Sequence, residues 1–133
     1  MYTYICENSI DGILTGIYTA YADRHPLRDI HLSVGEGMTL SLFTQYIEVT
    51  PDPVKAAKVA NTLKSRFGQD FYETIYQAAM SGDVPGKSTM DKADAIFETI
   101  ALALSSGDGT GTLLSLGEPC VYRLFELCRA TGR

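Results

Sequence analysis

Apolar side chains recur at helical spacing near the start of the chain. Between Ser9 and Arg24 they stand at i, i+3, i+4, i+7, i+8 and i+11, the spacing of one buried helical face. Ser9 is a natural N-cap, because its hydroxyl can accept a hydrogen bond from a backbone N–H of the first turn. The sequence therefore predicts a short apolar strand at residues 2–6 that is followed directly by an amphipathic helix.

Two later segments alternate between apolar and polar positions, as half-buried strands do. The segment 27–34 has its apolar residues at alternate positions from Ile30 to Val34, and the segment 45–49 alternates again. Gly35, which lies between them, tolerates the positive φ of a turn. We therefore expect a sheet of about three strands, at least partly antiparallel, with helices on one face to stabilise it.

The rest of the chain has helical periodicity. Asp52 and the prolines around it mark one helix start, because a proline in the first turn loses no hydrogen bond, and Gly68 marks that helix's end. A later helix is expected to be capped by Ser88 or Thr89, with Asp91 in its first turn. The expected helices cover residues 9–24, 53–67, 70–80, 88–104 and 117–132.

Two short segments connect the last helices. The segment 105–112 is rich in glycine, and we interpret it as a plain linker. The segment 113–116 is predicted to be an apolar turn that fills the core. The expected fold class is thus α+β, with a small sheet covered by four to five helices in a single domain at residues 1–133.

Composition and charge exclude several classes of function. The net charge of −5 disfavours broad non-specific binding of nucleic acid, although it leaves room for a local basic stripe. No apolar run approaches the roughly 20 residues that span a bilayer, and no signal peptide is recognisable, so we expect a cytoplasmic protein without a membrane contact. An odd number of cysteines fits reduced thiols. No C-x-x-C or H-x-x-x-H spacing is present, and we predict neither a metal site nor a cofactor.

Small residues form a strip along the first helix. Gly12 and Gly16 lie one turn apart, and Ala20 follows one turn later. Each helical glycine costs about 1 kcal/mol relative to alanine, so the pair indicates that something approaches the backbone closely. Either this strip packs tightly on the sheet or on another helix, or a ligand or partner lies against it.

Basic residues on two helices are candidates for contact with phosphate or nucleic acid. Lys55, Lys58 and Arg66 share the side of their helix opposite its apolar face. The alternative is an ordinary solvated surface. Arg123 and Arg129 form a second candidate on the last helix, where Glu126 lies three residues from each and can pair with them.

No catalytic arrangement is recognisable in the sequence. The serines lack a G-x-S-x-G context, and neither His25 nor His31 has an evident carboxylate partner. The apolar run Leu40, Ser41, Leu42 and Phe43 is similar to the end of the short peptides by which bacterial DNA enzymes dock on the sliding clamp, with Thr39 in place of their glutamine. The alternative is that this run packs onto the core.

Several stretches carry a resemblance in the same order along the chain: residues 4–21, 42–43, 50–52, 55–59, 75–76 and 117–119, with Val121, Arg123 and Leu124. Together they resemble a bacterial family of unknown function labelled "probable DNA metabolism protein". The resemblance is clearest over the strand and helix at the start. Its members are typically encoded beside a putative radical SAM protein, and in some the domain is fused to a uracil-DNA-glycosylase-like domain.

The resemblance implies a role in DNA repair or modification together with a radical SAM partner. Family members continue past the point that matches 132–133 into a basic, histidine-containing segment, so we expect this chain to be the N-terminal part of a longer protein. Two alternatives follow. In the first, the chain is a non-catalytic module for interaction with another protein. In the second, it belongs to an enzyme that acts on nucleobases or nucleotides, and the catalytic groups lie partly in that further segment.

Overall fold

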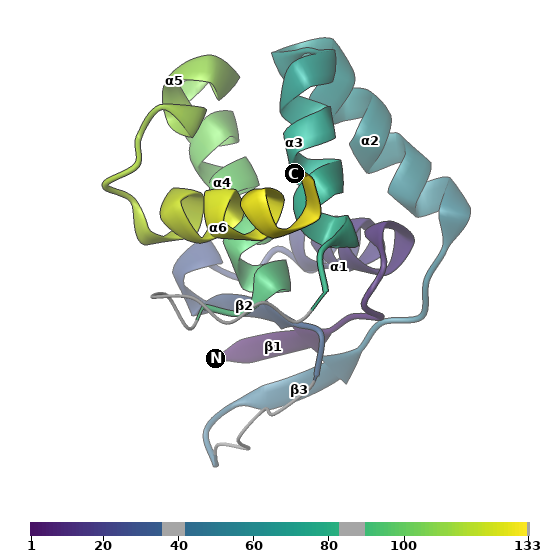
Figure 1. The fold of residues 1–133 in the computed structure, drawn as a ribbon. Helices are drawn as coiled ribbons and strands as arrows, with labels where there is room; N and C mark the ends of the chain where they lie inside the picture. The colour runs from purple at the N-terminus through teal and green to yellow at the C-terminus, as the bar shows by residue number, and fades with distance from the viewer. Residues whose placement is uncertain (36–41, 83–89, 133) are drawn as a thin grey trace.

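A three-stranded sheet lies beside a group of helices in the computed structural model, which describes residues 1–35, 42–82 and 90–132 (Figure 1). Strand β3 is at the edge of the sheet farthest from the helices (Figure 1). Among the described residues, no helix is long and apolar enough to cross a membrane. The elements are β1 (Tyr2–Ile5), α1 (Ile10–Asp23), a 3₁₀ turn (Leu27–Asp29), β2 (Ile30–Ser33), β3 (Gln45–Glu48), α2 (Pro53–Phe67), α3 (Gln69–Met80), α4 (Lys92–Ser106), α5 (Gly109–Leu113) and α6 (Pro119–Gly132).

The sheet is entirely parallel, and the expected antiparallel pairing is wrong. Strand β1 is central, in the order β2-β1-β3, and Tyr2 lies opposite both Ile30 and Gln45. Helix α1 carries the chain back to the starting end of β1, so β2 enters the sheet in the same direction. The alternation of apolar residues identifies a strand but contains no information about its direction.

Local side chains set the helix ends. The Gly12 N–H donates to Ser9 Oγ at 3.0 Å, which confirms the predicted cap of α1. The Asp52 carboxylate accepts from the Val54 N–H at the start of α2, and Gly68, with φ 97°, ends that helix. These are the positions that the sequence indicated.

Helix α4 begins later than expected. Asp91 is its N-cap and not a first-turn residue, because its carboxylate accepts from the Ala93 N–H at 2.8 Å. The predicted caps Ser88 and Thr89 lie outside the described residues. Asp91 also accepts from Ser33 Oγ at 3.1 Å and thereby joins α4 to the outer edge of β2.

Two predictions for the last helices are wrong. The expected linker contains the short helix α5, so the described residues have more helices than the four to five expected. The following apolar turn does not fill the core, because Leu114 and Leu116 are 77% and 56% exposed. Leu113 alone of these leucines packs against the core. Apolar periodicity predicts that a residue can be buried, whereas the fold decides whether a partner surface reaches it.

The core is formed mostly where the helices pack on one another, and the sheet contributes to it through β1 and β2. The largest fully buried side chains include Tyr4 of β1, Ile13 of α1, Ile75 of α3, Phe97 of α4 and Leu124 of α6. The three cysteines are unpaired thiols. Burial, and to a smaller extent the Asp91 carboxylate, raises the pKa of the Cys6 thiol to about 12. Cys6 is therefore an inert core residue.

Candidate nucleic-acid interface

The outer surface of α2 is the most basic feature of this acidic chain. Every charged side chain within the helix is basic, and all of them are exposed to solvent. The helical period places Ala56, Ala60 and Leu63 inward, where they are buried. The cations therefore project outward as a consequence of the sequence pattern. They are Lys55, Lys58, Lys64 and Arg66.

Aromatic rings lie beneath three of these cations, and the third pair is Arg66 with Phe67. The Lys55 Nζ is 5.5 Å from the centroid of the Tyr18 ring, and the Lys64 Nζ is 4.6 Å from that of Tyr72. Contacts of this kind attract a cation to the ring face by about 0.5–1 kcal/mol at exposed sites. They favour side-chain positions in which the charged ends remain available to solvent and to anions.

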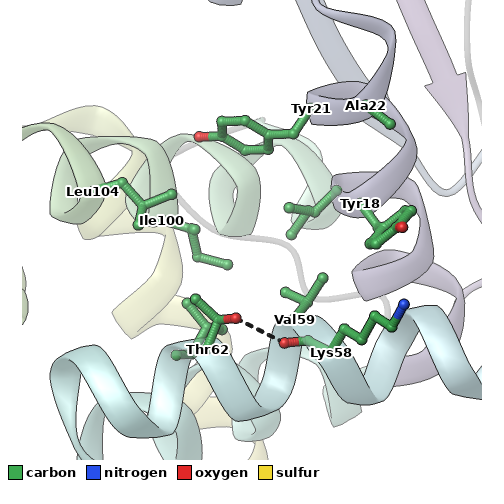
Figure 2. Close-up of a pocket in the computed structure, with 10 residues that line it drawn as sticks. Tyr18, Tyr21, Ala22, Lys58, Val59, Thr62, Ile100 and Leu104 are labelled. Atoms are coloured by element: carbon green, nitrogen blue, oxygen red, sulfur yellow. Dashed lines mark hydrogen bonds between the residues drawn. The ribbon is translucent and has the colours of Figure 1, made fainter.

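A pocket of about 400 Å³ opens between α1, α2 and α4 (Figure 2). Its walls are mostly apolar, and Tyr21 reaches from α1 toward Leu104 of α4 (Figure 2). Lys58 and Thr62 of α2 form its more polar side. The residues that line this α1–α2–α4 pocket are Ile17, Tyr18, Tyr21, Ala22, Lys58, Val59, Thr62, Leu63, Ile100 and Leu104.

The hydroxyl of Tyr21 has no hydrogen-bond partner among the described residues, although its oxygen is inaccessible to solvent. Burial raises the pKa of this phenol, so it stays protonated at neutral pH. The Thr62 hydroxyl, in contrast, donates to the Lys58 carbonyl at 2.9 Å (Figure 2). Buried polar groups are nearly always paired. The Tyr21 hydroxyl is thus an exception to this rule.

The residues of the pocket are suited to binding an apolar molecule. Its lining is mostly apolar, and its polar groups are the Lys58 amine and the hydroxyls of Tyr18, Tyr21 and Thr62. Flat apolar groups fit walls of this composition, and the neighbouring lysines can contact phosphate oxygens. Aromatic rings beside cations are the combination by which single-stranded nucleic acids are bound without sequence preference.

The structure separates the two groups of predicted basic residues. Lys55 and Lys58 lie together beside the pocket, and Arg66 follows near the end of α2. Arg129 is exposed on α6. Arg123 is buried instead: its guanidinium is 3.2 Å from Glu126, and its Nε–H donates to the Met90 carbonyl at 2.9 Å. Arg123 therefore belongs to the core and is not part of an exposed basic surface.

The strip of small residues on α1 is packed inside the chain. A Cβ atom on Gly12 would lie 2.4 Å from the Glu7 carbonyl oxygen, and one on Gly16 would lie 2.3 Å from Cys6 Sγ. Ala20 is completely buried. The strip thus faces the chain that leaves β1 and presents no surface to a second molecule in this structure.

Sequence reasoning missed two arrangements. Tyr18 and Tyr21 were expected on the buried face of α1, and their place in a pocket depends on how α2 and α4 pack around them. His31, for which no carboxylate partner was expected, has its Nδ1 3.1 Å from Asp94 Oδ2. The only available signal was the four-residue spacing of Asp94 and Glu98, which places both carboxylates on one side of a helix.

Burial dominates the electrostatics around His31. It raises the pKa of Asp94, and the hydrogen bond with His31 opposes that change. Burial raises the pKa of Glu98 as well, and the nearby Asp94 carboxylate adds to the effect. The two carboxyl groups are therefore close enough to influence each other.

Comparison with protein-family models, with curated proteins and with solved structures found no match.

Proposed function

We propose that this chain is an accessory protein of a bacterial DNA repair or modification system, which acts with a radical SAM partner and contacts single-stranded DNA through α2. The resemblance in the sequence supports the system and the partner. A single observation carries the DNA contact: every charged side chain of α2 is basic, in a chain whose net charge is −5. The α1–α2–α4 pocket adjoins these cations.

Phosphates and a base would use different parts of this surface. The phosphates lie along Lys55 and Lys58, where cations release bound counterions from the nucleic acid. An unstacked base enters the pocket against Tyr18 and Tyr21, and base–aromatic stacking contributes about 1–3 kcal/mol per base. The acidic remainder of the chain disfavours extended contact with a duplex.

Reversal of charge on α2 tests the DNA contact. Lys55→Glu with Lys58→Glu is expected to weaken the binding of a short fluorescein-labelled single strand at least about tenfold, measured by fluorescence anisotropy. The slope of log affinity against log salt concentration is expected to become shallower by about 1–2, because two phosphate contacts are lost.

The matched control is Arg28→Glu with Arg129→Glu, which changes the net charge equally at exposed positions away from α2. It is expected to retain most of the affinity. Equal weakening by both double variants, or an unchanged affinity in the α2 variant, would contradict the assignment to α2. Co-purification of the full-length protein with the radical SAM protein encoded beside it, with and without DNA, tests the partner separately.

A second candidate function is docking on a protein through the residues before β3. Leu42 and Phe43 are 94% and 87% exposed, so the expected alternative of packing onto the core does not hold for them. Leu40, the first apolar residue of this run, lies outside the described residues. Two adjacent large apolar side chains in solvent favour an interaction site. The resemblance of this run to clamp-docking peptides supports the bacterial sliding clamp as the partner.

A peptide of residues 38–45 tests this docking. It is expected to bind the purified clamp in a fluorescence-polarisation assay, because its two apolar side chains can fill a hydrophobic cleft. A peptide in which Leu42 and Phe43 are both alanine is the control and is expected not to bind. Absence of binding by the unaltered peptide at high micromolar concentration would rule out the clamp as the partner.

A further inference from the structure

Three potential metal ligands meet where α4 passes the outer edge of β2. They are His31 on the strand and Asp94 and Glu98 on the helix, and each is half-buried. One ligand atom from each residue can be chosen so that all three atoms lie within 4.8 Å of one another. We call this group the His31–Asp94–Glu98 cluster.

The fold holds the cluster in place from two sides. Strand β2 is at the edge of the sheet, and its Leu32 N–H donates to Asp94 Oδ1 at 3.2 Å. This bond orients the carboxylate and leaves its other oxygen directed at His31. Second-shell hydrogen bonds of this kind orient the ligands in metal sites. Glu98 follows Asp94 by four residues on the same side of α4.

The distances in the cluster suit metal coordination. His31 Nδ1 and Asp94 Oδ2 are 3.1 Å apart. Metal bonds to imidazole nitrogen and carboxylate oxygen are about 2.0–2.2 Å long, so two neighbouring ligands of one ion are about 3.0–3.6 Å apart. The observed separation is close to this range, and an ion bound to both groups would replace the proton of their hydrogen bond, with small rotations of the two side chains. A change of side-chain rotamer can bring the Glu98 carboxylate to the same ion.

A cavity of about 320 Å³ borders the cluster and gives such an ion access to small molecules. His31 and Glu98 both line it, together with Arg28, Glu118 and Cys120. Three protein ligands leave coordination positions open on an ion that prefers four to six. Water or a small anionic ligand can occupy these positions from the cavity.

We propose that the His31–Asp94–Glu98 cluster binds one divalent first-row transition-metal ion, with its remaining coordination positions open to the cavity. One imidazole and two carboxylates suit Zn²⁺ or Mn²⁺, whereas sites for Mg²⁺ or Ca²⁺ are built from oxygen ligands. This site goes beyond the proposed DNA contact. It is formed by β2 and α4, so the charge variants of α2 leave its ligands unchanged.

Metal titration of the full chain tests the site. With Zn²⁺ and with Mn²⁺ in separate experiments, calorimetry is expected to show one ion bound per chain. The melting temperature is expected to rise by about 5 °C or more at 100 times the dissociation constant. Glu98→Gln and His31→Gln are each expected to reduce the affinity at least about tenfold, because each replaces a carboxylate or imidazole ligand by a more weakly binding amide.

His25→Gln is the matched control, since His25 lies outside the cluster. Its ring stacks on that of Tyr2, with 3.6 Å between the ring centroids. It is expected to bind the ion as the unaltered chain does. Circular dichroism of Glu98→Gln without metal is expected to show the same fold as the unaltered chain. A loss of affinity in this variant is then due to the changed ligand and not to unfolding. Substitution by Co²⁺ is expected to give absorption typical of nitrogen and oxygen ligands and no thiolate charge-transfer band.

Three results would overturn the proposal. They are no binding of either ion at millimolar concentration, equal loss of affinity in His25→Gln, and unchanged affinity in both ligand variants. Each of these results would mean that the hydrogen bond between His31 and Asp94 serves only to join β2 to α4. Unaltered DNA binding in the two ligand variants is expected whether or not the ion binds, so failure of the metal site is distinguishable from failure of the DNA contact.

Discussion

Replacing Arg123 by alanine is expected to lower the free energy of unfolding by about 3–5 kcal/mol. The Arg123 side chain is 8% exposed, and it pairs with the equally buried Glu126 and with the Met90 carbonyl. Removal of the guanidinium leaves a buried carboxylate without this cation, which costs more than the ion pair itself contributes. Urea unfolding followed by circular dichroism measures the change.

Arg129→Ala is the control on the same helix. Arg129 is exposed, so its removal is expected to change the free energy of unfolding by less than about 0.5 kcal/mol. Arg123→Met combined with Glu126→Leu is expected to recover much of the loss, because apolar residues of similar size can replace a buried ion pair. If Arg123→Ala and Arg129→Ala cost the same, the buried pair does not stabilise the fold.

Gly16→Ala is expected to destabilise the chain by about 1–3 kcal/mol. Helix propensity alone predicts the opposite, since alanine is favoured over glycine by about 1 kcal/mol within a helix. The new Cβ atom would lie 2.3 Å from Cys6 Sγ and 3.3 Å from Leu32 Cδ2. Overpacking against the buried sulfur therefore outweighs propensity, and thermal or urea unfolding is the measurement.

The same substitution in a Cys6→Ala background isolates this contact. Without the sulfur, the nearest Cys6 atom is its Cβ at 3.8 Å, an ordinary contact distance. Gly16→Ala is then expected to be close to neutral. An equal cost in both backgrounds would show that the sulfur is not the obstacle. Gly12→Ala is not expected to be rescued in this way, because the Glu7 backbone carbonyl blocks it.

The candidate DNA interface was partly predictable from the sequence. The helical period of α2 buries Ala56 and Leu63 and thereby places Lys55 and Lys58 outside. The pocket beside them was not predictable, because its walls come from three helices and the orphan hydroxyl of Tyr21 depends on how they pack. Spacing within one segment contains no information about a cavity between segments.

The His31–Asp94–Glu98 cluster was not predictable for the same reason. Motif spacings recognise ligands that lie close together in sequence, such as two histidines on one helix. Here His31 precedes Asp94 by 63 residues, and only the packing of α4 on the edge of β2 joins them. The parallel direction of the strands and the burial of Arg123 likewise depended on long-range contacts.

By itself, the sequence determined the local features of this protein. Ser9, Asp52 and Gly68 set helix ends through hydrogen bonds or backbone angles within a few residues, so the surrounding fold does not alter them. The glycines of α1 likewise indicated a close approach to the helix. Only the tertiary structure decided which atoms make that approach, in which direction the strands run and which charges are buried. These properties depend on where distant segments meet, and no local pattern specifies that.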